Sequence, residues 1–198
     1  MARPRKFDER DVIAAARDVF WTQGYAATTI DDLGAATGLG RGSLYNAFGD
    51  KHTVFLRGLG QYCAEASEEI RTELRNTDLP ARDRLATHVH AFAASVASDT
   101  DRRGCLVAKS AAELSASDPD VVKLTKRTLD TWRRELFATI SEAQRDGDIP
   151  GDADPVSLAS MLLAVLQGIQ ALRQGGMSAA TATAAAEQAI ALLFGTAK

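Results

Sequence analysis

Residues 28 to 51 constrain the fold of this chain more than any other segment, because they encode a short helix, a sharp stop and a second short helix. The hydroxyls of Thr28 and Thr29 can cap a helix start, and Asp32 follows Thr29 at the spacing of a capping box. Gly38 can adopt the left-handed conformation that ends a helix. The segment therefore predicts a helix of about two turns from residue 29, followed by a tight turn.

The second short helix is expected from about residue 40 to residue 48. Leu44 and Phe48 stand one turn apart and are expected to face inward. Arg and Asn side chains match the edges of guanine and adenine, Ser and Tyr hydroxyls suit phosphate or either base, and Gly permits a close approach. The side chains expected to face outward, and to suit a DNA major groove, are Arg41, Gly42, Ser43, Tyr45 and Asn46.

Two flanking segments support this helix-turn-helix interpretation. Asp50 is expected to cap the next helix, which places the Lys51 ammonium at a helix N-terminus, where a phosphate is also favoured. Upstream, apolar residues at helical spacing predict a supporting helix from residue 8 to about residue 23, ended by Gly24. The residues expected to contact DNA are Thr28, Thr29, Arg41, Gly42, Ser43, Tyr45, Asn46 and Lys51, together with Arg3, Arg5 and Lys6 near the N-terminus.

These assignments have plainer alternatives. Tyr45 lies at helical spacing from Phe48 and could belong to the core, and Arg41 could be an ordinary solvated charge; their place on the exposed start of the second helix favours DNA contact. The formal net charge is -3, so a DNA interface would depend on local basic clusters near phosphates. The basic arm of residues 1 to 7 can enter a minor groove or grip the backbone, or it can be a solvated terminus.

The same residues resemble the tetracycline-repressor (TetR) family of bacterial regulators, whose DNA-binding domain has three helices and a Leu-Tyr-x-x-Phe-x-x-Lys pattern at its end. Leu44, Tyr45, Phe48 and Lys51 match that pattern. The resemblance covers residues 8 to about 57 and is architectural beyond them. Gly40 departs from it, because members often have a Ser there that caps the recognition helix, so a looser helix start is expected.

The resemblance implies an all-α fold, with a DNA-binding domain at residues 1–50 and a helical effector-binding and dimerisation domain at residues 51–198. It implies a homodimeric regulator of a palindromic double-stranded DNA operator, most simply a repressor that a small molecule releases. The chain has no run of eighteen apolar residues, and no apolar segment follows its basic start. We therefore expect no membrane span, no signal peptide and a cytoplasmic location.

Helical spacing continues through the rest of the chain without strand-like alternation. Breaks fall at Pro80, at Pro119, between residues 147 and 155, and at the glycine pair 175–176. Further helices are expected near residues 50–76, 81–98, 102–115, 119–146, 154–174 and 177–195, which makes nine in all. The long helix from residue 50 has an apolar stripe that runs through both domains, so it is a natural lever for moving the DNA-binding helices.

An effector site is expected among the later helices, where a pocket would be mainly apolar with a few hydrogen-bonding groups. Each candidate could instead be ordinary core, since Phe92 belongs to an apolar stripe with Leu85, Val89 and Val96 that needs no ligand to explain it. The candidate ligand-binding residues are Tyr62, Phe92, Cys105, Trp132, Phe137, Met161, Gln167 and Gln170.

The last two expected helices are long and rich in small residues, which suits close packing of one subunit on another. Some of their apolar side chains could face only the core of their own subunit. The candidate dimer-interface residues are Leu158, Leu162, Leu166, Ile169, Ala186, Ile190, Leu193 and Phe194.

Cys63 and Cys105 are the two cysteines, and no disulfide is expected in the absence of a secretory signal. Cys105 follows Arg102 and Arg103 near an expected helix start, a setting that favours a reactive thiolate. The Gly-Cys-Leu sequence at this point resembles TetR-family members that respond to electrophiles or oxidants. A thiol-based sensor is therefore an alternative function, and a packing role for Cys105 is the plainer one.

The sequence has no arrangement typical of catalysis, metal binding or a phosphate-cradling loop. His88 and His90 stand two residues apart on an expected helix, so their side chains point in different directions. We therefore expect no enzymatic activity, no metal and no cofactor. A helical small-molecule-binding protein without specific DNA binding is a further alternative, which the outward polar set at residues 41–46 argues against.

Overall fold

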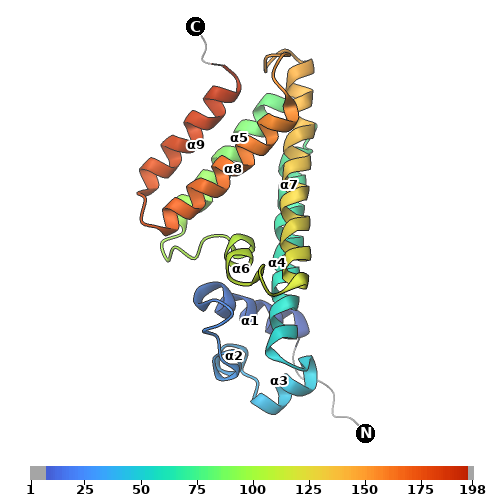
Figure 1. Cartoon of the computed structure of the whole chain (residues 1–198), viewed down its shortest axis with the longest axis vertical. Helices are drawn as coiled ribbons and strands as arrows, with labels where there is room; N and C mark the ends of the chain where they lie inside the picture. Colours follow the sequence, from blue (N-terminus) through green and yellow to red (C-terminus); the bar gives the residue numbers. More distant parts are fainter. Residues whose placement is uncertain (1–7, 196–198) are drawn as a thin grey trace. The chain divides into compact units, whose positions relative to one another are not determined.

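The computed structural model describes residues 8–195, and the basic Arg3, Arg5 and Lys6 lie outside this range. Within it, the chain forms nine α-helices and no β-strand, which confirms the expected all-α fold. The helices are α1 (Glu9–Gln23), α2 (Ile30–Thr37), α3 (Arg41–Phe48), α4 (Lys51–Leu74), α5 (Ala81–Ser98), α6 (Leu106–Leu114), α7 (Pro119–Arg145), α8 (Pro155–Gln174) and α9 (Ala179–Leu193), as labelled in Figure 1.

Two compact units make up the chain. Unit 1 contains the residues up to Glu65 together with Leu106–Lys126, and unit 2 contains Ala66–Cys105 together with the residues from Arg127 onward. The division falls within α4 and again within α7, so each of these helices contributes to both units. Unit 1 therefore includes α6, which is distant in sequence from α1, α2 and α3. The expected boundary at residue 50, between a DNA-binding domain and an effector-binding domain, stays a prediction.

Local signals set the ends of the first helices. The hydroxyl of Thr29 accepts the N–H of Asp32, while the Asp32 carboxylate accepts the N–H of Thr29, so the expected capping box is present. Gly38 has a φ of 69°, the left-handed conformation that ends α2. Gly40 is the N-cap of α3 and has no side chain with which to cap it. The predicted capping box of α2 and its stop at Gly38 are thus confirmed.

The core of unit 1 is formed where α1, α2, α3 and α4 meet. Phe20 of α1 is 1% exposed, and its ring packs edge-on against Phe55 of α4 with 5.2 Å between centroids. Leu33, Leu44 and Phe48 are buried as well, one from α2 and two from α3. Burial of these apolar side chains holds two helices of only eight residues each, which would not be stable alone.

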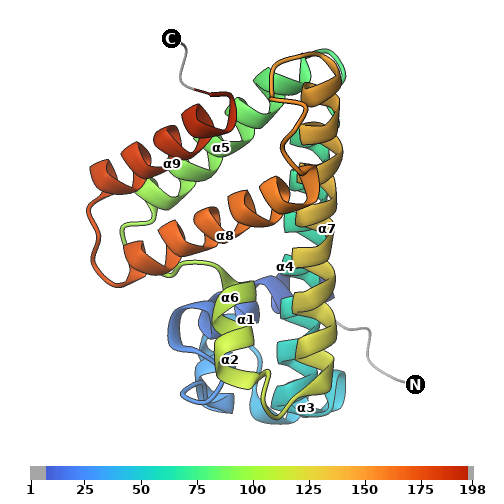
Figure 2. The ribbon, with the colours of Figure 1, turned by 45° about the horizontal axis from the view of Figure 1, so that its top comes forward.

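Unit 2 is a helical layer built around α5, α8 and α9. Helix α9 packs along α5 and α8. Figure 2 shows α9 directly beside α5, and in unit 1 it shows α6 beside α1. Leu85 of α5, Leu136 of α7, and Leu162 and Leu166 of α8 are fully buried in its core. The residues of this core come from segments far apart in sequence. The apolar stripe on each helix is therefore explained by its packing against helices that are distant along the chain.

Helix α6 begins at Leu106 rather than near residue 102, so the sequence placed its start too early. The carboxylate of Asp99 accepts the N–H groups of Arg103 (3.1 Å) and Gly104 (2.7 Å). Gly104 has a φ of 68°, which a residue with a side chain rarely adopts, and a Cβ at this position would collide with the side chain of Gln174. These contacts hold residues 99–104 in a non-helical loop, and Cys105 directly precedes α6.

Helix α8 is apolar enough to require separate mention. By length and composition it could cross a membrane, with a mean hydropathy of 1.6 in its most apolar window, of which 22% is buried. The expectation of no membrane span rests on the absence of an unbroken run of eighteen apolar residues, and this helix contains polar residues as well. A single helix of this kind is a weak indication of a membrane span, because the core helix of a soluble protein passes the same test.

Candidate nucleic-acid interface

The two faces of α3 differ sharply in exposure. Leu44 and Phe48 are 2% and 3% exposed, so they anchor the helix in the core of unit 1, as the sequence predicts. Tyr45 is 49% exposed, which excludes the alternative that it is an ordinary core residue. The other outward positions, Arg41, Gly42, Ser43 and Asn46, are exposed as well. The structure thus brings the predicted outward set together on one surface, which we call the α3 face (residues 41, 42, 43, 45 and 46).

Gly42 is the second residue of α3, and its position has open space around it. Apart from its chain neighbours and the backbone of α3 itself, no heavy atom of the described residues lies within 4 Å of the point where a Cβ would stand. Packing within unit 1 therefore does not require glycine here. Helix stability does not favour it either, because glycine is less favourable than alanine in a helix. A missing side chain at the exposed start of a helix is suited to close approach by another molecule.

Arg41 is paired with Asp31, which lies near the start of α2. The guanidinium donates from Nε to Oδ1 and from Nη2 to Oδ2, both at 2.6 Å. The side chains are 66% and 69% exposed, respectively. This hydrogen bond lowers the pKa of Asp31 below its usual range, so the carboxylate is ionised at neutral pH. The pair joins two helices across ten positions, and no local sequence pattern predicted it.

Lys51 and Thr28 are bound within unit 1. The Lys51 ammonium donates to the backbone carbonyl oxygens of Tyr25 and Thr28, both at 2.9 Å, and lies 4.3 Å from the centroid of the Tyr25 ring. Thr28 is 1% exposed, and its hydroxyl donates to the carbonyl of Gly24. The expectation that Thr28 contacts DNA therefore needs correction, because its side chain is covered. Thr29 is exposed at the N-terminus of α2.

Helix α6 holds the turn between α1 and α2 through two charged side chains that the sequence analysis did not select. The Lys109 ammonium donates to the carbonyl oxygens of Trp21 (2.7 Å) and Thr22 (3.0 Å), at the C-terminus of α1. The Glu113 carboxylate accepts the N–H groups of Tyr25 (2.9 Å) and Ala26 (2.6 Å). The last carbonyl groups of a helix and the N–H groups of the turn after it are the backbone groups that regular helix hydrogen bonds do not reach, and side chains often bind them.

We call this arrangement the α6 clamp (Lys109, Glu113 and the backbone of residues 21–26). Its two side chains stand one turn apart on α6 and carry opposite charges. The Lys109 ammonium meets the negative C-terminal end of the α1 dipole, and the Glu113 carboxylate meets two N–H groups of the turn. No local sequence pattern marks such residues, because their partners lie more than eighty positions away. The clamp fixes the segment that leads into the N-terminus of α2.

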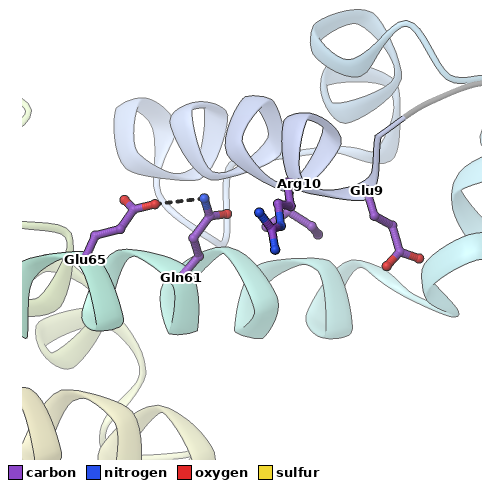
Figure 3. Close-up of a pocket in the computed structure, with 5 residues that line it drawn as sticks. Glu9, Arg10, Gln61 and Glu65 are labelled. Carbon is purple, nitrogen blue, oxygen red and sulfur yellow. Dashed lines mark hydrogen bonds between the residues drawn. The ribbon is translucent and has the colours of Figure 1, made fainter. Parts of the chain in front are cut away.

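A groove of about 410 Å³ lies elsewhere in unit 1, between α1 and α4 (Figure 3). Its lining includes Glu9 and Arg10 from α1 and Gln61 and Glu65 from α4. The Glu65 carboxylate accepts from Gln61 (2.8 Å) and from Arg17 (2.7 Å). Carboxylates in this groove would repel phosphates, so we do not include it in the nucleic-acid interface.

The predicted ligand-binding residues do not form one set. Phe92 and Trp132 lie together in unit 2, with ring centroids 5.7 Å apart, and Trp132 Nε1–H donates to His88 Nε2 at 2.8 Å. The other ring nitrogen of His88, Nδ1, is 2.5 Å from the Glu73 carboxylate. This buried network satisfies its own polar groups. Tyr62 is in unit 1, where its ring packs against Trp21 with centroids 5.0 Å apart.

The remaining ligand candidates belong to unit 2 and differ in exposure. Phe137 and Met161 are 38% and 46% exposed, and Phe137 lines an open groove of about 350 Å³ with Val156 of α8. Cys105 is half-buried, as are Gln167 and Gln170. The side-chain nitrogen of Gln167 is buried and has no hydrogen-bond partner among the described residues. No group of three or more metal-binding side chains is found within residues 8–195.

Six of the eight candidate dimer-interface side chains lie in the core of unit 2. They cannot reach a second subunit while this unit keeps its fold, which corrects the assignment made from the sequence. The six are Leu162, Leu166, Ile169, Ala186, Ile190 and Leu193. Leu158 and Phe194 are partly buried against the same core. Other large apolar side chains of the same helices are exposed, namely Val156, Met161 and Leu172 of α8 and Leu192 of α9.

These features define a helix-turn-helix protein whose second unit, in the residues that the structure describes, has helices and connecting loops but no strand. The chain matches the family model for the DNA-binding part, "Bacterial regulatory proteins, tetR family", over residues 12–57, and the model "Tetracyclin repressor-like, C-terminal domain" over residues 81–190. The second match alone spans more than half of the chain. The protein belongs to the TetR family of DNA-binding transcriptional regulators.

Relatives and solved structures agree with this assignment. The HTH-type transcriptional repressor ComR of Escherichia coli K12 is 28% identical over 176 residues, which cover 89% of this chain and 84% of ComR. The HTH-type transcriptional repressor DhaR of Mycobacterium sp. GP1 is 27% identical over 79% of this chain and 77% of DhaR. A cysteine-substituted CifR bound to 26-bp operator DNA is 28% identical, with a TM-score of 0.80 over 96% of this chain and 98% of CifR.

Proposed function

We propose that the protein is a homodimeric repressor that binds a palindromic DNA operator and is released from it by a small molecule. The observation that carries this proposal is the α3 face, where polar side chains capable of reading bases are exposed while Leu44 and Phe48 hold the opposite side of the helix in the core. The repressor names of ComR and DhaR, and the operator complex of CifR, support it.

In the proposed complex, the residues of the α3 face have distinct roles. Arg41 and Asn46 reach base edges, Ser43 and Tyr45 contact phosphate or base, and Gly42 allows the backbone to approach. Thr29 lies at the exposed N-terminus of α2, where backbone N–H groups favour a phosphate. Lys51 uses two of its three ammonium hydrogens within unit 1, which leaves one for a phosphate. Contacts from Arg3, Arg5 and Lys6 stay a prediction.

The proposed effector site is in unit 2. The buried Gln167 nitrogen supports this location, because a donor without an acceptor is costly and a ligand oxygen would satisfy it. Phe92 and Trp132 supply aromatic surface in the same unit, and Gln170 lies one turn beyond Gln167 on α8. An effector bound there must favour the form of the protein that does not bind DNA.

The proposed dimer interface is formed by the exposed apolar side chains of α8 and α9. Leu172 and Leu192 are 61% and 62% exposed, and Met161 is 46% exposed. Several large apolar side chains left in water on neighbouring helices are typical of a surface that a second subunit covers. This interface also gives the apolar character of α8 an explanation other than a membrane. A DNA-binding regulator acts where the DNA is, so the proposal includes a cytoplasmic location. The proposal includes no catalytic activity.

A second candidate mode of release acts through Cys105. The thiol is half-buried beside Gly104, which has no room for a side chain because Gln174 fills the space. Gln174 also donates to the carbonyl of Arg103 at 2.9 Å. An added group on Cys105 would disturb this crowded loop directly before α6. The test uses an oxidant that releases the wild-type protein from DNA. If that oxidant also releases the Cys105→Ser variant, this candidate is ruled out.

The experiment that tests the proposal is selection of bound duplexes from a random 26-bp DNA library by the purified wild-type protein. We expect a palindromic sequence to be enriched. Its affinity should exceed that of a scrambled duplex, fall steeply with added salt, and weaken when Arg41 or Tyr45 is changed to alanine. Enrichment of no sequence would contradict the proposal and favour a helical binding protein that does not recognise specific DNA.

A further inference from the structure

The geometry of the Asp31–Arg41 pair leaves half of the guanidinium available. Asp31 is the second residue of α2, and Arg41 is the first residue of α3. The carboxylate accepts from Nε and from one hydrogen of Nη2, the side-on contact of a planar fork with two oxygens. Three N–H groups remain, two on Nη1 and one on Nη2, and one from each of these nitrogens lies on the Nη1–Nη2 edge. That edge can make the two parallel hydrogen bonds by which arginine recognises guanine.

Stability gives a weak reason for this pair. Both side chains are about two-thirds exposed, and ion pairs at such positions contribute little to folding. A carboxylate on a surface that meets phosphates also weakens binding to DNA of any sequence. The charge at position 31 is thus unfavourable for affinity, and the pair contributes little to the fold in return.

Other carboxylates near this surface have capping roles. Asp32 completes the capping box with Thr29, and Asp50 accepts the N–H of Thr53 in the first turn of α4. Asp31 also lies in the first turn of α2, where a negative charge interacts favourably with the helix dipole. A dipole role alone does not call for the two short, matched hydrogen bonds to a side chain of the following helix.

We propose that Asp31 is a positioning residue for DNA recognition, which holds the Arg41 guanidinium so that its free edge is presented to a base. This inference rests on the proposed function. Arginine is long and flexible, and a held fork loses less freedom when it binds a base edge than a mobile one does. The carboxylate also discourages Arg41 from binding phosphates at sites of the wrong sequence. Asp31 therefore lowers affinity for DNA in general and raises discrimination between sequences.

The test compares Asp31→Asn with a matched control, Asp120→Asn. Asp120 is the exposed second residue of α7 in unit 1, so the control removes the same charge at the same helical position. The probes are the duplex that the wild-type protein selects from the random library and a scrambled duplex of equal composition. For Asp31→Asn we expect tighter binding to the scrambled duplex and an approximately tenfold smaller affinity ratio between the two duplexes. Asp120→Asn should leave the ratio unchanged.

A double-mutant cycle separates positioning from a general effect of charge. If Asp31 acts through Arg41, Asp31→Asn should leave the affinity ratio unchanged in an Arg41→Ala background. Equal strengthening of binding to both duplexes by Asp31→Asn, or an equal loss of the ratio with and without Arg41, would overturn the inference while leaving the proposed function standing. Failure of the wild-type protein to enrich any duplex would overturn both.

Discussion

Replacing Gly42 with alanine is expected to stabilise the folded protein and to weaken its binding to DNA. Beyond its chain neighbours and the backbone of α3, the added methyl group meets no heavy atom of the described residues within 4 Å, so it introduces no clash inside unit 1. Alanine is favoured over glycine within a helix by about 0.5–1 kcal/mol, and the lower value applies to a first turn. For a chain of this length, about 0.5 kcal/mol raises the Tm by about 1–2 °C.

The effect on DNA binding has the opposite sign. If the start of α3 approaches the bases closely, a methyl group at this position pushes neighbouring side chains out of hydrogen-bonding range. Loss of one paired contact to a base costs about 1–3 kcal/mol, or about 5- to 150-fold in affinity. The affinity for the selected duplex should fall by about tenfold or more, while binding to the scrambled duplex changes less.

Thermal unfolding followed by circular dichroism and fluorescence anisotropy with a labelled duplex measure the two effects. Gly60→Ala is the matched control, because Gly60 lies within α4 and a Cβ there also meets open space. We expect it to raise stability without changing DNA affinity. Unchanged affinity in Gly42→Ala would refute the proposed close approach, and a lower Tm would refute the inference that the protein itself has no need of glycine at this position.

Three other predictions follow from particular contacts. Glu113→Ala should cost about 1–2 kcal/mol of stability, as loss of a helix cap does, and should speed hydrogen exchange of the two amides that Glu113 holds; unchanged exchange would contradict the α6 clamp. Glu135 has a pKa below its usual 4.5, chiefly because Arg75 donates to it, so its stabilising effect is present above about pH 4.5 and is lost as the pH falls further; wild-type stability should therefore drop more steeply below this pH than that of Glu135→Gln. Leu172→Asp should convert the proposed dimer to monomers in analytical ultracentrifugation without unfolding them, because this side chain is 61% exposed in the subunit.

Much of the candidate site could be predicted from the sequence because its determinants are local. The Thr29 capping box, the stop at Gly38, and the division of α3 into a buried side and an exposed side depend on residues within about four positions of one another. The same local logic predicted the number of helices and the positions of most of their ends. It placed the start of α6 too early. The loop before α6 is stabilised by hydrogen bonds to Asp99, and no sequence signal for a helix end marks these bonds.

Tertiary structure decided what each charged or apolar side chain does. Lys51 is predicted at the correct helix start, yet its ammonium is held by two backbone carbonyls of the turn between α1 and α2. Glu113 would be taken for a solvated charge, yet it holds that same turn from a helix more than eighty residues away. Leu162 would suit an interface between subunits, yet it is fully buried within its own. An amphipathic pattern records that a face is covered, whereas only the folded chain determines what covers it.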